Sequence, residues 1–268
     1  MQTAMTDFTT VQLDFDPRGF ATLWLDRADR NNAFDAEMIR ELILALDMVK
    51  DRRELRFLLL RGRGRHFSAG ADLVWMREAA GLDYDANLAD AQTLAELMYN
   101  LYHLKLPSLA VVQGAAFGGA LGLIACCDLA IGASNAQFCL SEVRIGLAPA
   151  VIGPFVVQAI GERAARRYAL SGERFDGARA RELGLLAECY PAAGLEAALE
   201  QWIATLLHNG PQAMRATKDL LREVGSGALN PALRRYTESA IARLRVGPEG
   251  QEGLRAFLEK RQPAWQEQ

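Results

Sequence analysis

The sequence is poor in the residues that hold metal ions or form disulfides. Its 268 residues include only four cysteines and three histidines, and no pair of cysteines has the C-x-x-C spacing. The histidines, His66, His103 and His208, form no zinc motif. We therefore expect no metal site and free, buried thiols in a reducing cytoplasm.

Long apolar runs and an excess of positive charge are also missing. No run approaches the ~20 apolar residues that cross a bilayer, and the first residues, M-Q-T-A-M-T-D-F, lack the basic and apolar regions of a signal peptide. The net charge of −3 argues against a nucleic-acid surface. We predict a cytoplasmic protein with neither a membrane nor a nucleic acid as its partner.

What is present is an ordinary globular composition, half hydrophobic and a quarter charged. Alternating apolar residues predict a β-hairpin over 11–25, and wholly apolar runs at 57–60 and 109–112 predict buried strands. Further strands are predicted at 128–132, 136–140 and 185–190, and only helical patterns follow them. We predict an α/β protein with a strand-rich core over 1–194 and a helical region over 195–268.

Two polar stretches are predicted to lie at the surface. Residues 77–90 contain Gly and Asp and precede a helical pattern that begins at Ala91, so we expect a mobile surface segment there. We interpret the basic turn Arg61–Arg65 as a solvated loop.

The chain is organised around a strand, a glycine turn and a helix start between Leu109 and Gly122. Gly118 and Gly119 fall where the helix begins, so backbone N–H groups there have no partner inside the helix. The spacing matches neither common phosphate-binding motif. It indicates a donor site for an anion or for an oxygen that becomes anionic, or else a pair of glycines that only allows tight packing.

A second stretch of small residues, Ser68–Asp72, follows another buried strand. Glu142 is a single acid in an otherwise apolar loop, 23 residues after Gly119. Two N–H donors and one carboxylic acid suit proton transfer beside a thioester carbonyl, because the donors stabilise an enolate while the acid moves the proton. The alternative is that Glu142 is a surface carboxylate near Arg144.

In order and spacing, several motifs together closely resemble the crotonase (enoyl-CoA hydratase/isomerase) family over nearly the whole chain. They are R-A-D-R-N-N-A-F (27–34), F-S-A-G-A-D-L (67–73), Q-G-A-A-F-G-G-A (113–120), C-C-D-L-A-I (126–131), Q-F-C-L-S-E-V-R-I-G-L (137–147) and G-Q-E-G-L-R-A-F-L-E-K-R (250–261).

The resemblance implies a crotonase (ClpP-like) spiral of ββα units with a C-terminal helical region that builds trimers or hexamers. It implies that the amides of Ala71 and Gly119 form an oxyanion hole and that Glu142 is the catalytic acid. The acyl-CoA is the substrate, so no cofactor is expected. The residues it implies for CoA or substrate binding are Arg30, Ala33, Ala69, Asp72, Leu73 and Val74, with Phe257 and Lys260 reaching the CoA of an adjacent subunit.

One position departs from the family pattern. In hydratases with two catalytic glutamates, the first glutamate lies three residues after the oxyanion glycine. This chain has Gly122 at that position. A single acid suits a Δ3,Δ2-enoyl-CoA isomerase, which returns one proton to another carbon. It also suits the hydratases of 3-branched glutaconyl-CoA esters that the chain resembles. Our hypothesis is that a second carboxylate of that substrate, or water ordered by it, replaces the missing acid in part.

Of these hydratases, the sequence favours those of isohexenylglutaconyl-CoA (acyclic terpene breakdown), with 3-methylglutaconyl-CoA (leucine breakdown) close behind. The reason is a set of small residues expected beside the pocket, unless they serve only helix packing: Ala116, Ala120, Ala148, Ala150 and Gly153. A non-catalytic scaffold or RNA-binding protein of the same fold is a minor alternative, disfavoured by Glu142 and the donor motifs. A dehalogenase or thioesterase would need a carboxylate placed differently.

Overall fold

The computed structural model describes residues 7–266; the first six residues, where we predict no signal peptide, lie outside the described part. Six strands form the main sheet in the order β1-β2-β3-β4-β6-β9, and three short strands form a second sheet, β5-β7-β8. The main sheet is parallel apart from its first pair, a hairpin. The strands are β1 (Val11–Asp16), β2 (Phe20–Leu25), β3 (Leu58–Gly62), β4 (Ser108–Val112), β5 (Ala115–Phe117), β6 (Leu129–Ala133), β7 (Gln137–Cys139), β8 (Phe175–Asp176) and β9 (Glu188–Tyr190).

Helices follow most of the strands and fill the C-terminal quarter of the chain. The α-helices are α1 (Ala36–Lys50), α2 (Leu73–Ala79), α3 (Tyr84–Tyr102), α4 (Gly119–Cys126), α5 (Gly153–Ile160), α6 (Glu162–Ser171), α7 (Gly177–Glu182), α8 (Leu195–His208), α9 (Pro211–Ser226), α10 (Pro231–Val246) and α11 (Pro248–Glu259). The 3-10 turns are η1 (Ala28–Arg30), η2 (Glu142–Ile145), η3 (Ala192–Gly194) and η4 (Ala264–Gln266).

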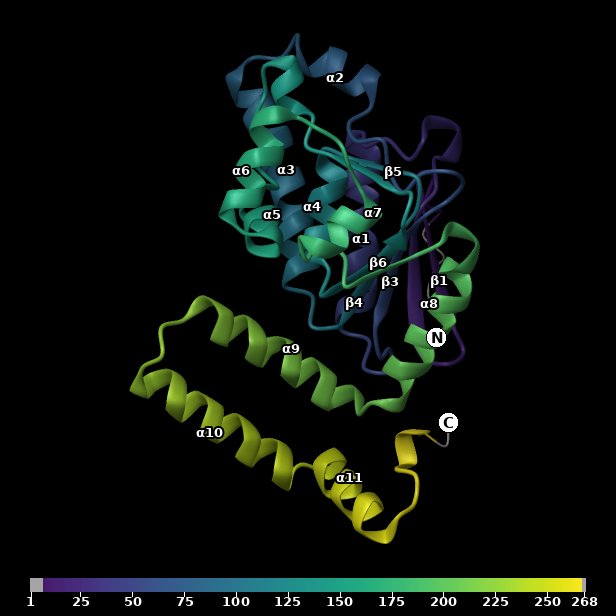
Figure 1. Cartoon of the computed structure of the whole chain (residues 1–268), viewed down its shortest axis with the longest axis vertical. Helices are drawn as coiled ribbons and strands as arrows, with labels where there is room; N and C mark the ends of the chain where they lie inside the picture. Colours follow the sequence, from purple (N-terminus) through teal and green to yellow (C-terminus); the bar gives the residue numbers. More distant parts are fainter. Residues whose placement is uncertain (1–6, 267–268) are drawn as a thin grey trace.

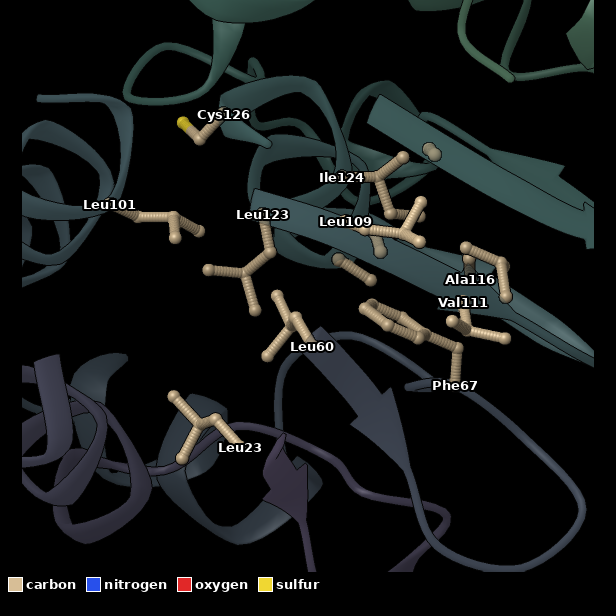
Figure 2. Packing of buried hydrophobic residues seen from close by; sticks show 14 of the residues in the cluster. Leu23, Leu60, Phe67, Leu101, Leu109, Val111, Ala116, Leu123, Ile124 and Cys126 are labelled. Atoms are coloured by element: carbon tan, nitrogen blue, oxygen red, sulfur yellow. The ribbon is translucent and has the colours of Figure 1, made fainter. Parts of the chain in front are cut away.

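The predicted hairpin and buried strands are confirmed. The Gly19 N–H closes the turn on the Asp16 carbonyl at 2.9 Å, and Gly19 has a positive φ of 93°, which glycine adopts without strain. All five residues of β4 are buried. Side chains of β3, β4 and α4 converge with Phe67 on one interior (Figure 2). This interior fixes the strand ends from which the candidate site is built.

Two predictions about surface segments are wrong in part. The stretch 77–90 lies at the surface as predicted, but most of it is helical: Asp83 caps α3 by accepting a hydrogen bond from the Ala86 N–H at 2.9 Å, so the helix begins at Tyr84 and not at Ala91. The Arg61 and Arg63 guanidinium groups lie over the Trp24 ring, 4.5 and 3.9 Å from its centre. These two side chains are therefore packed against the sheet and are not part of a solvated loop.

The C-terminal helices differ in how they relate to the sheet. The apolar face of α8 belongs to the main core through Leu195, Leu199, Ile203 and Leu206. By contrast, α9, α10 and α11 extend away from the sheet as an arm, shown in yellow-green and yellow in Figure 1. In the described part of the chain, no helix is long and apolar enough to cross a membrane. The division into domains at residue 195 stays a prediction.

Candidate active site

The first candidate donor, the Ala71 amide, is oriented by Phe34. The two residues pair as an isolated parallel bridge. The Phe34 N–H donates to the Gly70 carbonyl, the Asp72 N–H donates to the Phe34 carbonyl, and both distances are 2.7 Å. In a parallel pairing of this kind, the residue between the two bonded neighbours turns its own N–H to the opposite side. The Ala71 N–H therefore points away from Phe34, and Ala71 is exposed.

The second candidate donor, the Gly119 amide, is the first N–H of α4. At this position an N–H has no acceptor within its own helix and lies at the positive end of the helix dipole. Gly118 precedes it with φ 54° and ψ −124°, a conformation available essentially to glycine alone. The Gly118 N–H is fixed by the Cys139 carbonyl at 2.9 Å. The two glycines thus turn the chain so that the next amide is left open.

Two contacts bring these donors together. Ser68 pairs with Ala116 as a second parallel bridge, and the Phe117 N–H donates to the Ser68 carbonyl at 3.1 Å. The Phe34 ring lies 3.4 Å from where a Cβ on Gly119 would stand. Phe34 therefore holds one donor by its backbone and touches the other with its ring. Two amides converging on one place can stabilise negative charge on a thioester oxygen.

Glu142 lies beside this helix start. It is the first residue of η2, and its Oε1 lies 3.3 Å from where a Cβ on Gly118 would stand. Its Oε2 is buried, and the part of the chain that the structure describes supplies it with no hydrogen-bond partner. Burial raises the pKa of the Glu142 carboxyl above its ordinary value. A carboxyl next to two open amides, with its pKa shifted toward neutrality, suits the role of acid and base.

Gly122, the position of the missing first acid, lies buried one turn into α4. The small residues expected beside the pocket divide into two groups. Ala116 and Ala120 are fully buried in the core, whereas Ala148 and Ala150 lie exposed in the loop between η2 and α5. Gly153, the fifth, is half-buried, and a Cβ built on it would have nothing within 4 Å. Ala148, Ala150 and Gly153 therefore leave room for a substituent without disturbing the packed core.

Backbone hydrogen bonds hold three of the predicted CoA-binding residues together. The Ala33 N–H donates to the Arg30 carbonyl at 3.1 Å, and the Ala69 N–H donates to the Asn31 carbonyl at 2.9 Å. The Arg30 side chain is largely exposed, with Asp29 at 3.8 Å as its ion-pair partner. A cavity of about 390 Å³ begins here, lined in part by Arg27, Arg30, Asp72, Val74 and Trp75. The same lining contains the carboxylates of Asp35, Glu37, Asp72 and Glu78, so this cavity is not predominantly basic and the predicted contact with CoA stays a prediction.

A helix cap and an ion pair fix the position of the Asp72 carboxylate. Its Oδ1 caps α2 by accepting from the Val74 N–H at 2.8 Å, and its Oδ2 lies 3.3 Å from Arg27 Nη2. Arg27 also pairs with Asp35, the cap of α1, at 2.7 Å. Because the Asp72 carboxylate is fully engaged, we expect any contact of Asp72 with CoA to come from its backbone.

The remaining predicted residues are exposed and divide between two distant places. Leu73 and Val74 open α2 beside Ala71, with 77% and 48% of their surface exposed. Phe257 and Lys260 lie on or just after α11, at the end of the molecule opposite α2 in Figure 1. Within one chain they do not meet the site, so the predicted role requires a second copy.

Two residues that orient the site were not predicted from the sequence. Phe34 and Arg27 both lie in the motif at 27–34. However, an aromatic residue after a polar loop is usually interpreted as a core residue, and an arginine in such a loop as a surface residue. Their role depends on a parallel bridge and on two carboxylates distant in the sequence, so no local pattern reports it.

Similarity to known proteins agrees with this geometry. The family described as enoyl-CoA hydratase/isomerase matches residues 16–268. The crystal structure of an enoyl-CoA hydratase from Shewanella pealeana is 48% identical, covers 97% of each chain and superposes with a TM-score of 0.92.

Two curated bacterial relatives extend the similarity. A putative enoyl-CoA hydratase of Thermus thermophilus is 32% identical over 91% of this chain and 96% of its own. The 2,3-dehydroadipyl-CoA hydratase of Escherichia coli is 30% identical over 90% and 92%. The match over residues 16–268 and these relatives establish that the chain belongs to the enoyl-CoA hydratase/isomerase family, with the crotonase fold, and is an enzyme of the enoyl-CoA hydratase type.

Proposed function

We propose that the protein adds water across the double bond of a 3-branched glutaconyl-CoA ester. The observation that supports this most strongly is the site itself: two open amides for the thioester oxygen and Glu142 as the single acid beside them. A glutaconyl ester brings a second carboxylate of its own. That carboxylate would order the attacking water in place of the missing glutamate, whose position in the chain is occupied by Gly122.

In the proposed addition, the proton that the attacking water loses is the one that C2 gains. The Ala71 and Gly119 amides hold the thioester oxygen and draw electron density from the double bond. Water attacks C3 and gives up a proton to the Glu142 carboxylate, and an enolate forms on the thioester. Glu142 then returns the proton to C2 as the enolate collapses. No electron is gained or lost, so the acyl-CoA and water are the only reactants and no redox cofactor is needed.

Between the two candidate substrates we favour isohexenylglutaconyl-CoA over 3-methylglutaconyl-CoA. The exposed Ala148 and Ala150 leave open the loop that follows Glu142, where a long 3-substituent could leave the site. The name of the Escherichia coli relative, a hydratase of 2,3-dehydroadipyl-CoA, shows that an acyl chain with a second carboxylate occurs among the relatives.

The test is a comparison of kcat and KM for water addition to 3-methylglutaconyl-CoA, isohexenylglutaconyl-CoA and crotonyl-CoA. We expect both glutaconyl esters to react with a higher kcat than crotonyl-CoA, because only they carry the second carboxylate. Equal kcat values for the three would remove the proposed role of that group.

A Δ3,Δ2-enoyl-CoA isomerase is the second candidate, favoured by the single acid. Glu142 would then remove a proton from C2 of a 3-enoyl ester and return it to C4, and no water would enter. Incubation with a trans-3-enoyl-CoA in H₂¹⁸O distinguishes the two reactions. An isomerase converts the 3-enoyl ester to the 2-enoyl ester without incorporating ¹⁸O. A hydratase leaves the 3-enoyl ester unchanged and incorporates ¹⁸O at C3 only when a 2-enoyl ester is supplied.

A further inference from the structure

The absence of a second acid in α4 has a structural cause in the neighbouring elements. Gly122 and Gly119 lie three residues apart, so they share a face of the helix one turn from each other. A side chain at residue 122 would therefore be the nearest one that α4 could offer to the oxyanion donors.

That space is already filled with carbon. A Cβ on residue 122 would lie 2.3 Å from Ile152 Cγ2, 2.8 Å from Ile152 Cβ and 3.1 Å from Met98 Cε. Real Cβ atoms do not approach other atoms that closely, so even alanine would force a shift. Ile152 and Met98 are 2% and 0% exposed and sit in a packed interior, where neither side chain can move aside freely.

Ile152 is tied to the same loop as Glu142. It directly precedes α5, and its carbonyl accepts from the Val156 N–H at 3.0 Å. The Gly153 N–H donates back to the Pro149 carbonyl at 2.8 Å. One segment thus supplies the acid at its start and the apolar residue that fills the opposite wall at its end.

We propose that Ile152 determines the reaction specificity of this site: with Met98 it fills the volume that a second acid would need, and it leaves proton transfer to Glu142 alone. The inference rests on the proposed function for the identity of the acid. It goes further in naming the residue that disfavours enoyl esters without a second carboxylate, such as crotonyl-CoA, which bring no group to replace the missing acid.

The packing part of the proposal is tested by a double-mutant cycle on stability. Ile152→Ala removes Cγ2, the nearer of the two Ile152 atoms that block residue 122, and leaves only Cβ, at 2.8 Å, whereas the matched control Ile152→Val keeps both. We expect Gly122→Ala to lower the Tm strongly in the wild-type and Ile152→Val backgrounds and far less in the Ile152→Ala background. Equal losses in all three backgrounds would overturn the proposal.

The chemical part is tested with crotonyl-CoA. Gly122→Glu in the Ile152→Ala background should raise kcat for crotonyl-CoA hydration at least about tenfold over Ile152→Ala alone, since general acid–base groups contribute this much or more. Gly122→Gln in the same background offers the same shape without the charge and should give no gain. The gain should bring a second ionisation into the pH profile of kcat.

Two further results would contradict the proposal. Gly122→Glu in the wild-type background could fold with an unchanged Tm, which would show that the space is open. The Glu and Gln variants in the Ile152→Ala background could have equal kcat. If neither folds, the stability cycle alone decides. Failure of the proposed substrate would appear separately, in the wild-type comparison of glutaconyl esters with crotonyl-CoA.

Discussion

At the scale of single residues, the Glu142 carboxyl is the group on which the chemistry depends. Replacement by Gln keeps its shape and removes its proton exchange, so we expect kcat to fall by about two to four orders of magnitude. The exposed Glu162, which pairs with Arg166, is a matched control whose change to Gln should leave kcat unaltered. A Glu142→Gln variant that retains more than about a tenth of the activity would show that another group moves the proton.

The same substitution should have a characteristic effect on stability. Because burial raises the pKa of Glu142 in the folded protein, the folded state binds this proton more tightly than the unfolded state. The stability of the wild-type protein therefore falls as pH rises from the ordinary glutamate value through the raised one. Glu142→Gln lacks this loss, so its Tm relative to wild type should increase over that interval and stay constant above it.

The Gly119 amide can be removed only through the backbone. Gly119→Pro deletes the N–H at the first helical position, where proline fits the helix, and should cost about 3 kcal/mol of transition-state stabilisation in kcat/KM. Gly119→Ala keeps the N–H and meets only the Phe34 ring at 3.4 Å, so it serves as the control. Similar kcat/KM values for the two variants would remove this amide from the oxyanion hole.

At the scale of elements, the ion pairs of Arg27 join the starts of α1 and α2. Burial alone would raise the pKa of Asp72, but the Val74 and Trp75 amides and the charge of Arg27 outweigh it and lower this pKa below its ordinary value. A carboxyl with a lowered pKa contributes stability above its unfolded pKa and loses it as pH falls through the folded one.

Asp72→Asn should therefore destabilise the protein near neutral pH. Asn still caps the helix, so the loss is the charged contact with Arg27, about 1 kcal/mol. The Tm difference from wild type should disappear in acid as the wild-type carboxyl becomes protonated. Asp83, which caps α3 through the Ala86 N–H, provides the comparison. Asp83→Asn should change the Tm less, and an equal change would mean that Arg27 contributes nothing.

Much of the element order could be predicted from the sequence, and the failures have physical reasons. Strong patterns such as the hairpin over 11–25 and the buried strand at 109–112 predict elements where the structure has them. The three-residue strand β5 is too short to show a period, and its partner β7 comes about twenty residues later. The start of α3 was missed because its first turns are exposed and polar, so the Asp83 cap marks the start and apolar spacing does not.

The candidate site could be predicted in its residues but not in its construction. Small residues and a lone acid after buried strands point to Ala71, Gly119 and Glu142 without any coordinates. That Phe34 orients one donor, or that Ile152 fills the space beside Gly122, follows from contacts between segments distant in sequence. No property of a single segment carries that information.

At the scale of the whole molecule, the arm of α9–α11 leaves a large apolar surface uncovered in one chain. Phe257 and Leu258 are 81% and 78% exposed, and Leu221 is 62% exposed. Monomeric proteins seldom expose such surfaces. We predict a trimer or a dimer of trimers, measured by light scattering at micromolar concentration, in which Phe257 and Lys260 approach the acyl-CoA of a neighbouring copy. A monomer would contradict both predictions.

The parallel bridge at Phe34 also determines which backbone protons water can reach. The amides of Phe34 and Asp72 are bonded on either side of Ala71, whose own N–H faces the open site. In hydrogen–deuterium exchange on the free enzyme, the Ala71 amide should therefore exchange fast, whereas the hydrogen-bonded amides of Phe34 and Asp72 should exchange slowly. A bound thioester should slow this amide and that of Gly119 together, so the two donors would report occupancy of the site even in a variant that cannot turn over.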